Sequence, residues 1–281
     1  MIQNVAAQTG ASIRKVCAVL EEPRSSFYEA ATPSQRQLDD LQIGDLIDAI
    51  FRRHRKRYGY RRLAKELEDQ GVLCAPARIR RIMAQRGLRA LQPKTFVPRT
   101  SDGRADQPSP NLLFQKPFPE APNQVWVGDI TYIPTAQGWL YLAVVIDLYS
   151  RRIVGWSLAN HLRAELVIAA LAQALQTRAI CGTIFHSDRG SQYGSTAYRR
   201  RLAAAGLRQS MSARANPYDN AWSESFIGTL KLEMLQGGVF QDATDARTEI
   251  FDYIDGYYNT HRKHSSIQYQ TPAQFEAQFA H

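Results

Sequence analysis

Three acidic residues of this chain, Asp129, Asp188 and Glu224, are candidates for a site that binds divalent cations. Asp188 follows an apolar run, residues 183–185, that is too short for a helix, so we expect it at the end of a buried strand. Glu224 follows a turn-rich segment and begins a stretch of helical periodicity, and 35 residues separate it from Asp188. Because hard divalent cations prefer carboxylate oxygens, three such acids brought together would suit Mg²⁺.

Such a site would act on phosphodiesters. Two divalent ions about 4 Å apart activate an oxygen nucleophile and stabilise the leaving oxygen. Without metal, each pair of carboxylates repels by up to about 4 kcal/mol at an effective dielectric near 20. An isolated Asp after a strand is more often a turn residue, and we expect Asp147 to be one because a hairpin turn, residues 148–151, follows it.

The stretch after Glu224 predicts an amphipathic helix. Its apolar positions recur at helical spacing: Phe226, Ile227, Leu230 and Met234. At about 100° per residue, Glu224, Gly228 and Lys231 share the opposite face. Because Gly228 removes bulk between an acid and a base, this face can admit a phosphate backbone.

Three motifs occur in order along the chain. They are Trp126-x-x-Asp129-Ile130-Thr131, His186-Ser187-Asp188-x-Gly190-x-Gln192-Tyr193, and Asp219-Asn220-Ala221-x-x-Glu224-Ser225-Phe226-x-x-x-Leu230-Lys231. Together they resemble the Asp-Asp-Glu core of retroviral integrases and bacterial transposases. Within that group, residues 116–280 most closely resemble the OrfB-type transposases of the IS-three insertion-sequence family. Three motifs in this order are far more specific than any one alone.

The resemblance implies a DNA transposase with a ribonuclease-H-like fold. Asp129, Asp188 and Glu224 would bind two Mg²⁺ (or Mn²⁺) ions for cleavage at an element end, and the freed 3′-OH would then attack a second phosphodiester. We expect Lys231 to contact DNA phosphate. Three further residues are expected to contact DNA or shape the site: Asn220, Gln192 and Tyr193.

Charge and proline content divide the chain. Residues 51–104 hold 16 Lys and Arg against four acids, whereas the rest of the chain is net negative. This basic block is either a solvated face or a surface that binds nucleic acid. We favour nucleic-acid binding, because the block lies next to a phosphoryl-transfer motif. Residues 92–123 hold seven of the 13 prolines and read as an extended linker. The expected domains are an N-terminal helical segment at 1–36, a basic helix-turn-helix domain at 37–91, a Pro-rich linker at 92–115, and the catalytic core with a C-terminal helical extension at 116–281.

The basic region is expected to be all-helical. Ser12 should cap a first helix that is broken at Pro23, and this segment is either a helix-turn-helix or a pair of packing helices. An amphipathic helix at 37–53 should be mainly core-forming. A helix that follows from the run at residues 58–63 and ends at Gln70, and a second helix at 77–86, resemble the helix-turn-helix module that precedes the OrfB-type core. Their arginines are expected to contact DNA, mostly through phosphate: Arg61, Arg62, Arg78, Arg80 and Arg81.

The core is expected to be an α/β fold with a mixed five-stranded sheet and flanking helices. The predicted strands are 124–133, 139–147, 152–158, 183–187 and 208–212, with helices at 164–179, 196–205 and from Glu224. Thr271 should cap a last short helix. His261 and His264 fit a surface or packing role better than a metal site, because the sequence places no third ligand near them.

Composition narrows the class of protein. There is no apolar run of about 18 residues, and the three cysteines are scattered, so we expect a cytoplasmic protein with reduced thiols and no membrane partner. The resemblance to bacterial transposases implies a bacterial protein that is associated with the nucleoid when bound to DNA. The expected partners are DNA at element ends and targets, further copies of the chain on DNA, and an upstream helix-turn-helix/leucine-zipper protein or fusion partner. Two alternatives remain: a metal-dependent nuclease of the same fold, and a nonenzymatic DNA-binding regulator that needs only residues 1–91.

Overall fold

The computed structural model describes residues 2–25, 27, 33–92, 108–212, 221–236 and 238–279. The chain forms two compact units, Met1–Ala90 and Leu91–His281. No helix among these residues combines the length and the apolar character that crossing a membrane requires.

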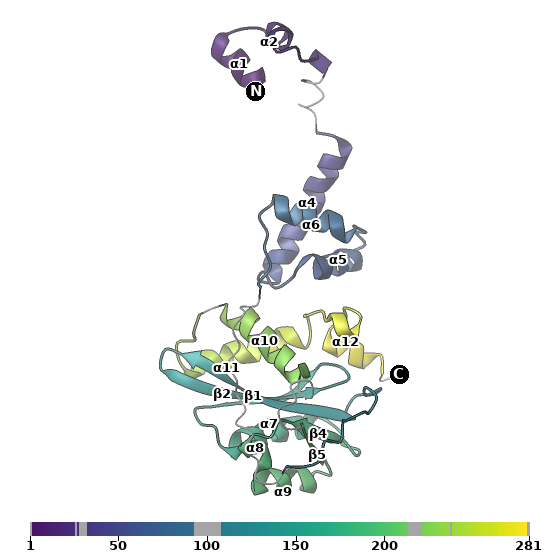
Figure 1. Ribbon diagram of the computed structural model, residues 1–281, viewed down its shortest axis with the longest axis vertical. Helices are drawn as coiled ribbons and strands as arrows, with labels where there is room; N and C mark the ends of the chain where they lie inside the picture. The colour runs from purple at the N-terminus through teal and green to yellow at the C-terminus, as the bar shows by residue number, and fades with distance from the viewer. Residues whose placement is uncertain are drawn as a thin grey trace. The chain divides into compact units, whose positions relative to one another are not determined.

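The first unit is helical (Figure 1). Its helices are α1 Ile2–Thr9, α2 Ile13–Val19, α4 Gln35–Arg53, α5 Tyr60–Asp69 and α6 Pro76–Gln85. Ser34 begins α4 with a capping box, in which its side chain accepts from the backbone of Gln37 and the Gln37 side chain accepts in return. Gly71 follows α5 at φ +79°, a left-handed conformation that glycine adopts without strain.

Two expectations for this unit were wrong. Ser12 precedes α2, but its side chain makes no capping hydrogen bond. The apolar residues in the first half of α4 are largely exposed, with Leu38 at 41% and Leu41 at 56%. The buried residues of α4 begin at Gly44. The core of the unit therefore forms where α5 and α6 pack on the second half of α4, and periodicity alone does not reveal that limit.

The second unit contains a mixed five-stranded sheet, which confirms the predicted fold class. The strands are β1 Val125–Thr135, β2 Gly138–Asp147, β3 Ile153–Ala159, β4 Ile184–Ser187 and β5 Arg208–Met211, in the order β3-β2-β1-β4-β5. β2 is antiparallel to both β1 and β3, whereas β4 runs parallel to β1 and β5 parallel to β4. β1 is thus the central strand.

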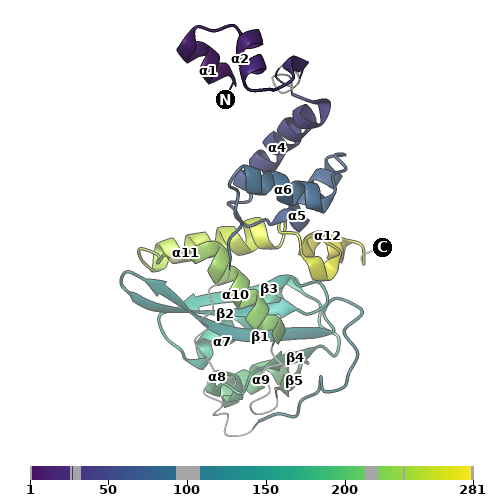
Figure 2. The ribbon, with the colours of Figure 1, turned by 45° about the horizontal axis from the view of Figure 1, so that its top comes forward.

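Helices cover both faces of this sheet (Figures 1 and 2). One face carries α7 Ala164–Thr177, α8 Ser191–Gly194 and α9 Thr196–Ala204, and the other carries α10 Ala221–Leu235 and α11 Ala243–Phe251. A π-helical segment, Asp252–Tyr258, a short 3₁₀ turn, Ser265–Ile267, and α12 Pro272–Ala277 complete the chain. Thr271 caps α12 with Gln274 in a capping box, as predicted.

The side chains of β1 alternate between the two layers. Trp126 and Ile130 belong to the core formed with α7 and α9, whereas Ile133 belongs to the core formed with α10 and α11. Asp129 shares the second face with Ile133, because successive residues of a strand point to opposite sides. Gly128 faces the first layer, where an added Cβ would meet the Phe185 ring at 2.5 Å. Glycine therefore lets β1 and its neighbours close up immediately beside Asp129.

Candidate active site

Asp129 and Asp188 are brought together by the parallel pairing of β1 and β4. The last paired residues are Gly128 and Ser187, so the next residue along each strand is one of these two acids. An Asp129 oxygen accepts from the Ile130 N–H at 2.8 Å, and an Asp188 oxygen accepts from the Gly190 N–H at 3.0 Å. The parallel pairing of β1 and β4 thus places two carboxylates next to each other at the point where β4 ends.

Both acids line one pocket of about 180 Å³. Its lining consists of Asp129, Ile130, Tyr132, Leu162, Asp188, Gly190, Gln192 and Tyr193. Beyond Gly128, β1 is paired with β2 alone along most of its length, because β4 stops at Ser187. The pocket therefore opens along the free edge of the central strand.

Glu224 approaches from the helical layer that covers the Asp129 face. It lies in the first turn of α10 and is exposed, whereas Phe226 and Leu230 bury the opposite side of that helix. Burial and the Asp188 charge are the larger causes of the raised pKa of Asp129, and the Glu224 charge adds to them. Within the part of the chain that the structure describes, no three His, Cys, Asp or Glu side chains converge tightly enough to hold a metal ion. The structure thus joins two acids closely and places the third within electrostatic reach.

The Asp129 carboxyl has a strongly perturbed pKa. Burial, followed by the negative charge of Asp188, raises the pKa of Asp129 to about 8, because its exposed fraction is only 6%. Lys231 is half-buried, and that burial lowers the pKa of its ammonium, while the Asp129 charge opposes the effect. The lysine therefore lies within electrostatic reach of Asp129, and its contact with DNA phosphate stays a prediction.

Three further residues were expected to contact DNA or shape the site: Gln192, Tyr193 and Asn220. Gln192 lines the pocket and donates to the Leu162 carbonyl at 3.0 Å. Tyr193 is only 2% exposed and packs edge-on against Tyr198 at 5.4 Å. Tyr193 thus forms part of the pocket floor, and its burial argues against the direct DNA contact that we expected. Asn220 lies outside the described residues.

Asp147 has the structural role that its hairpin turn predicted. It is fully buried, and its oxygens accept from the backbone N–H groups of Asn123 at 2.6 Å and of Tyr149 and Ser150 at 3.0 Å each. The bonds from Tyr149 and Ser150 close the turn between β2 and β3, and the bond from Asn123 holds the segment before β1 against that turn. Asp147 does not line the pocket of Asp129 and Asp188.

The chain resembles known proteins in both of its units. Two family models described as integrase core domains match residues 119–217 and 205–272, and one described as an HTH-like domain matches residues 37–96. The chain is 41% identical over 245 residues to the transposase for insertion sequence element IS904 of Lactococcus lactis, covering 87% of this chain and 97% of that protein. It is 40% identical over 270 residues to transposase InsF for insertion sequence IS3A of Escherichia coli, covering 94% of each. The chain belongs to the IS3-family transposases.

Solved structures show weaker likenesses to this transposase. The HTLV-2 integrase catalytic core domain in complex with magnesium (trimeric form) is 16% identical, with a TM-score of 0.43 over 56% of this chain and 98% of that one. The simian T-cell lymphotropic virus intasome in complex with a PP2A regulatory subunit is 17% identical, with a TM-score of 0.47 over 76% and 70%. Both scores lie below 0.5, so family membership rests on the curated relatives and family models.

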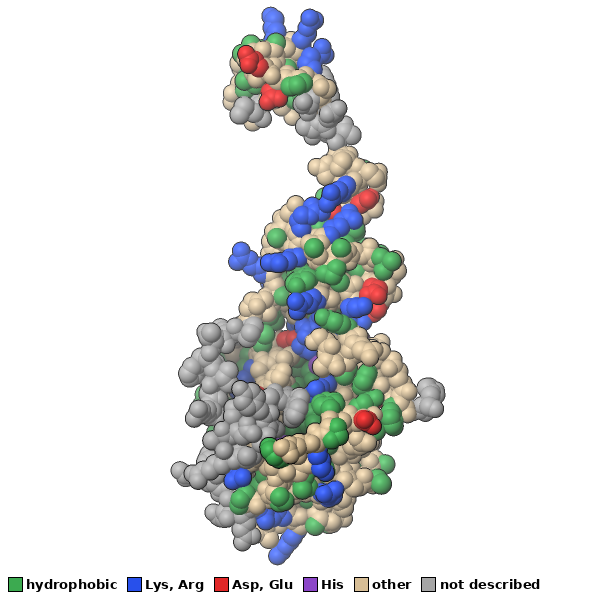
Figure 3. Space-filling view, turned by 45° about the vertical axis from the view of Figure 1, so that its right-hand side comes forward, with side chains coloured by type: hydrophobic (Ala, Val, Ile, Leu, Met, Phe, Trp, Pro, Cys, Tyr) green, Lys and Arg blue, Asp and Glu red, His purple; other side chains and the backbone are tan. Residues whose placement is uncertain are grey.

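In the basic unit of the transposase, some of the arginines that were predicted to contact DNA form ion pairs within the unit. Lys and Arg side chains gather on this unit (Figure 3). Arg78 and Arg81 on α6 both donate to Asp40 on α4, at 2.6 and 2.7 Å. The Arg78 hydrogen bond, followed by that of Arg81, lowers the pKa of Asp40. Arg78 and Arg81 therefore help to dock α6 on α4.

The three remaining arginines differ in exposure. Arg62 is half-buried over the Tyr58 ring, with 5.6 Å from its guanidinium carbon to the ring centre. Arg61 is exposed and lies 5.5 Å from the centre of the Tyr60 ring, and Arg80 is also exposed. Arg61 and Arg80 are thus the better placed of the five for DNA, and contact with DNA stays a prediction for all five.

A buried ion pair that we did not predict anchors α10. Arg262 donates to both carboxylate oxygens of Glu233, with nitrogen–oxygen distances of 2.8–3.0 Å, and both side chains are at most 5% exposed. The Tyr253 hydroxyl donates to the same carboxylate at 2.9 Å, and the His264 ring packs edge-on against Tyr258 at 4.7 Å. Glu233 lies on the helix that carries Glu224 and Lys231. The pair therefore fixes α10 against the C-terminal segment.

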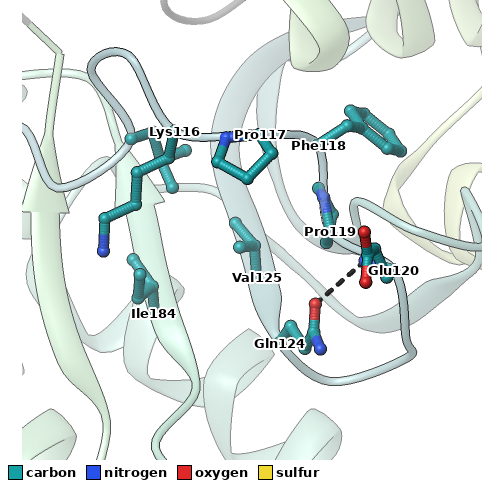
Figure 4. Close-up of a pocket in the computed structure, with 9 residues that line it drawn as sticks. Lys116, Pro117, Phe118, Pro119, Glu120, Gln124, Val125 and Ile184 are labelled. Atoms are coloured by element: carbon teal, nitrogen blue, oxygen red, sulfur yellow. Dashed lines mark hydrogen bonds between the residues drawn. The ribbon is translucent and has the colours of Figure 1, made fainter.

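A second cavity, of about 310 Å³, lies away from the acids (Figure 4). It is formed between the segment around Pro117 and the strand residues Val125 and Ile184, and a hydrogen bond from the Glu120 N–H to Gln124 closes one side. Neither Asp129 nor Asp188 lines it. We assign it no chemistry.

Proposed function

We propose that this transposase cleaves phosphodiesters at the ends of its element and joins the freed 3′-OH to target DNA, with Asp129, Asp188 and Glu224 as the metal-binding acids. The observation that carries the proposal is the register of β1 and β4, which ends on Gly128 and Ser187 and leaves the two aspartates adjacent. α10 adds Glu224 from the layer over the Asp129 face, and that acid already acts on the Asp129 pKa.

The donor set suits a hard divalent cation. In the described part of the chain, Asp129 has no Lys or Arg within ion-pair distance, and its hydrogen-bond partner is a single backbone N–H. A buried carboxyl repelled by other acids would gain most from a bound cation, because the cation offsets both the burial and the repulsion. Two bound ions would supply activation of the attacking oxygen and stabilisation of the leaving oxygen.

Other residues of the chain would hold the DNA. The space beside Gly228 is open, since an added Cβ would meet nothing within 4 Å. That opening lies between Glu224 and Lys231 on the helix, so a phosphate can approach while the Lys231 ammonium donates to it. The exposed arginines of the basic unit would bind the sugar-phosphate backbone of the element end.

The setting follows from this chemistry. We propose that element ends and target DNA are the partners and that several copies of the chain act together on DNA. An upstream helix-turn-helix/leucine-zipper protein or fusion partner would add end recognition. The protein would act in the bacterial cytoplasm, on the nucleoid.

A strand-transfer assay tests the proposal. The purified chain is incubated with labelled element-end DNA and a supercoiled plasmid, with and without Mg²⁺. We expect metal-dependent cleavage and joined products from the parent, and neither from Asp188→Asn. Glu165→Gln is the matched control, because Glu165 is an exposed acid on α7 outside the pocket. Cleavage without joining would indicate the nuclease alternative, and equal activity of parent and Asp188→Asn would refute the site.

A further inference from the structure

An aromatic surface continues from the acidic pocket along the β1–β2 hairpin. Its members, called the aromatic platform below, are Tyr132, Tyr141 and Trp139. Tyr132 pairs directly with Tyr141 in the ladder, and Trp139 pairs with Pro134, two residues further toward the hairpin tip. Because side chains alternate along each strand, all three rings lie on the same face of the hairpin.

The platform is connected to the site by one residue. Tyr132 lines the pocket together with Asp129 and Asp188. The Tyr132 ring contacts Tyr141 with centroids 5.1 Å apart and contacts Trp139 edge-on at 6.1 Å. A strand of DNA with its scissile phosphate at the acids would therefore meet aromatic rings as soon as it left the pocket along β1.

The exposure of Trp139 is unusual for a residue of its size. Its side chain is 60% exposed, whereas Trp126 on the neighbouring strand is fully buried. A large indole in contact with water leaves an aromatic face available to a flat ligand. Between Tyr132 and Tyr141 the chain carries no acidic residue that would repel a phosphate backbone.

The hairpin is also held in place before any ligand arrives. The Ala136 N–H donates to the Phe240 carbonyl at 2.8 Å, and the Phe240 N–H donates to the Pro134 carbonyl at 3.2 Å. The Thr135 hydroxyl closes the turn by donating to the Gly138 carbonyl at 2.8 Å. A platform fixed in this way loses little conformational freedom when a flat ligand stacks on it.

We propose that the aromatic platform stacks unpaired nucleobases of the DNA strand that enters or leaves the acidic pocket. The inference rests on the proposed function for the presence of DNA at the acids. It adds that the substrate is locally unpaired there, because a base inside a duplex has no free face to offer. Every base has an aromatic face, so this binding would tolerate different sequences.

Binding of a fluorescent single strand tests the platform without metal or catalysis. The probe is a single-stranded oligodeoxythymidylate with one 2-aminopurine, whose fluorescence falls when it stacks. We expect the full chain to quench the probe, and Trp139→Ala to lose the quenching and weaken binding by about 5- to 150-fold, the range for one stacked base. Trp139→Phe should retain most of both effects, because it keeps an aromatic face.

Phe251→Ala is the matched control, since Phe251 is a 56%-exposed aromatic residue on α11. It should bind and quench like the parent. Equal quenching by Trp139→Ala and the parent would overturn the proposal. The proposal would also be overturned if Trp139→Ala without DNA sedimented differently from the parent while the probe signal stayed the same. That result would show that the platform is a contact between copies of the chain. Joining activity without quenching refutes the platform alone, and quenching without metal-dependent joining refutes the proposed function alone.

Discussion

The raised pKa of Asp129 predicts how the stability of the metal-free core depends on pH. Asp129 has a pKa of about 8 in the folded chain, against an ordinary value of 3.8. A carboxyl whose folded pKa is raised binds its proton more tightly in the folded state than in the unfolded state. Its contribution to stability is fully present below about pH 4 and is lost as the pH rises through about 8.

The size of this effect follows from the shift. One pKa unit corresponds to about 1.4 kcal/mol, so the change from 3.8 to about 8 amounts to roughly 6 kcal/mol at most. A domain is stable by about 5–15 kcal/mol in total, so the loss would be large. Asp129→Asn keeps the volume and cannot ionise. We expect this variant to lose most of the pH dependence between pH 5 and 9 and to be more stable than the parent at pH 9.

Urea unfolding monitored by tryptophan fluorescence measures the effect. All four tryptophans lie after residue 91, so the signal reports the core unit. Unfolding is followed from pH 5 to 9 in a chelating buffer, with Glu165→Gln as an exposed-acid control that should follow the parent. A flat parent profile, or an equal slope in Asp129→Asn, would refute the electrostatic account of this site.

Three further predictions concern residues around the acids and on the basic unit. Lys231→Ala should weaken end binding or joining while the core unfolds at the same urea concentration, and a collapse of the core would show instead that its stem is needed for packing. Arg262→Met should destabilise the core by about 3–5 kcal/mol, because it leaves Glu233 buried and unpaired. Adding Glu233→Leu should recover much of that loss. An unchanged urea midpoint in Arg262→Met would contradict the anchoring role of the ion pair. Arg80→Ala should reduce the slope of log binding constant against log salt concentration by about 1, the value for one lost phosphate contact. Arg78→Ala should mainly lower the melting temperature of the basic unit. The reverse pattern would contradict the inference that exposed Arg80 binds DNA while Arg78 holds α6 on α4.

The core fold was predictable because its signals are local. Short apolar runs ending at Asp188 and Asp147, and helical spacing after Glu224, each lie within about ten residues of sequence. The strand pattern therefore placed both strand-end acids correctly. The adjacency of Asp129 and Asp188 follows from the parallel register, which no single stretch of sequence contains.

The features that were missed depend on partners far apart in the chain. Asp40 binds Arg78 and Arg81 across 38 and 41 residues, so the arginines looked free when only their own helix was considered. Glu233 and Arg262 are 29 residues apart, and each alone reads as an ordinary surface charge. Tyr193 was expected to contact DNA, but it is buried in the pocket floor with its hydroxyl under β1. Tertiary packing decides each of these cases.

Metal rescue of a cysteine variant tests the central claim most directly. Asp188→Cys replaces a hard oxygen ligand with a sulfur ligand, which binds Mg²⁺ poorly and softer divalent ions better. If Asp188 is a metal ligand, strand transfer by Asp188→Cys should be absent in Mg²⁺ and should return in Mn²⁺, while the parent is active in both. Equal loss of activity in the two metals, with the fold intact, would contradict direct metal binding at this position.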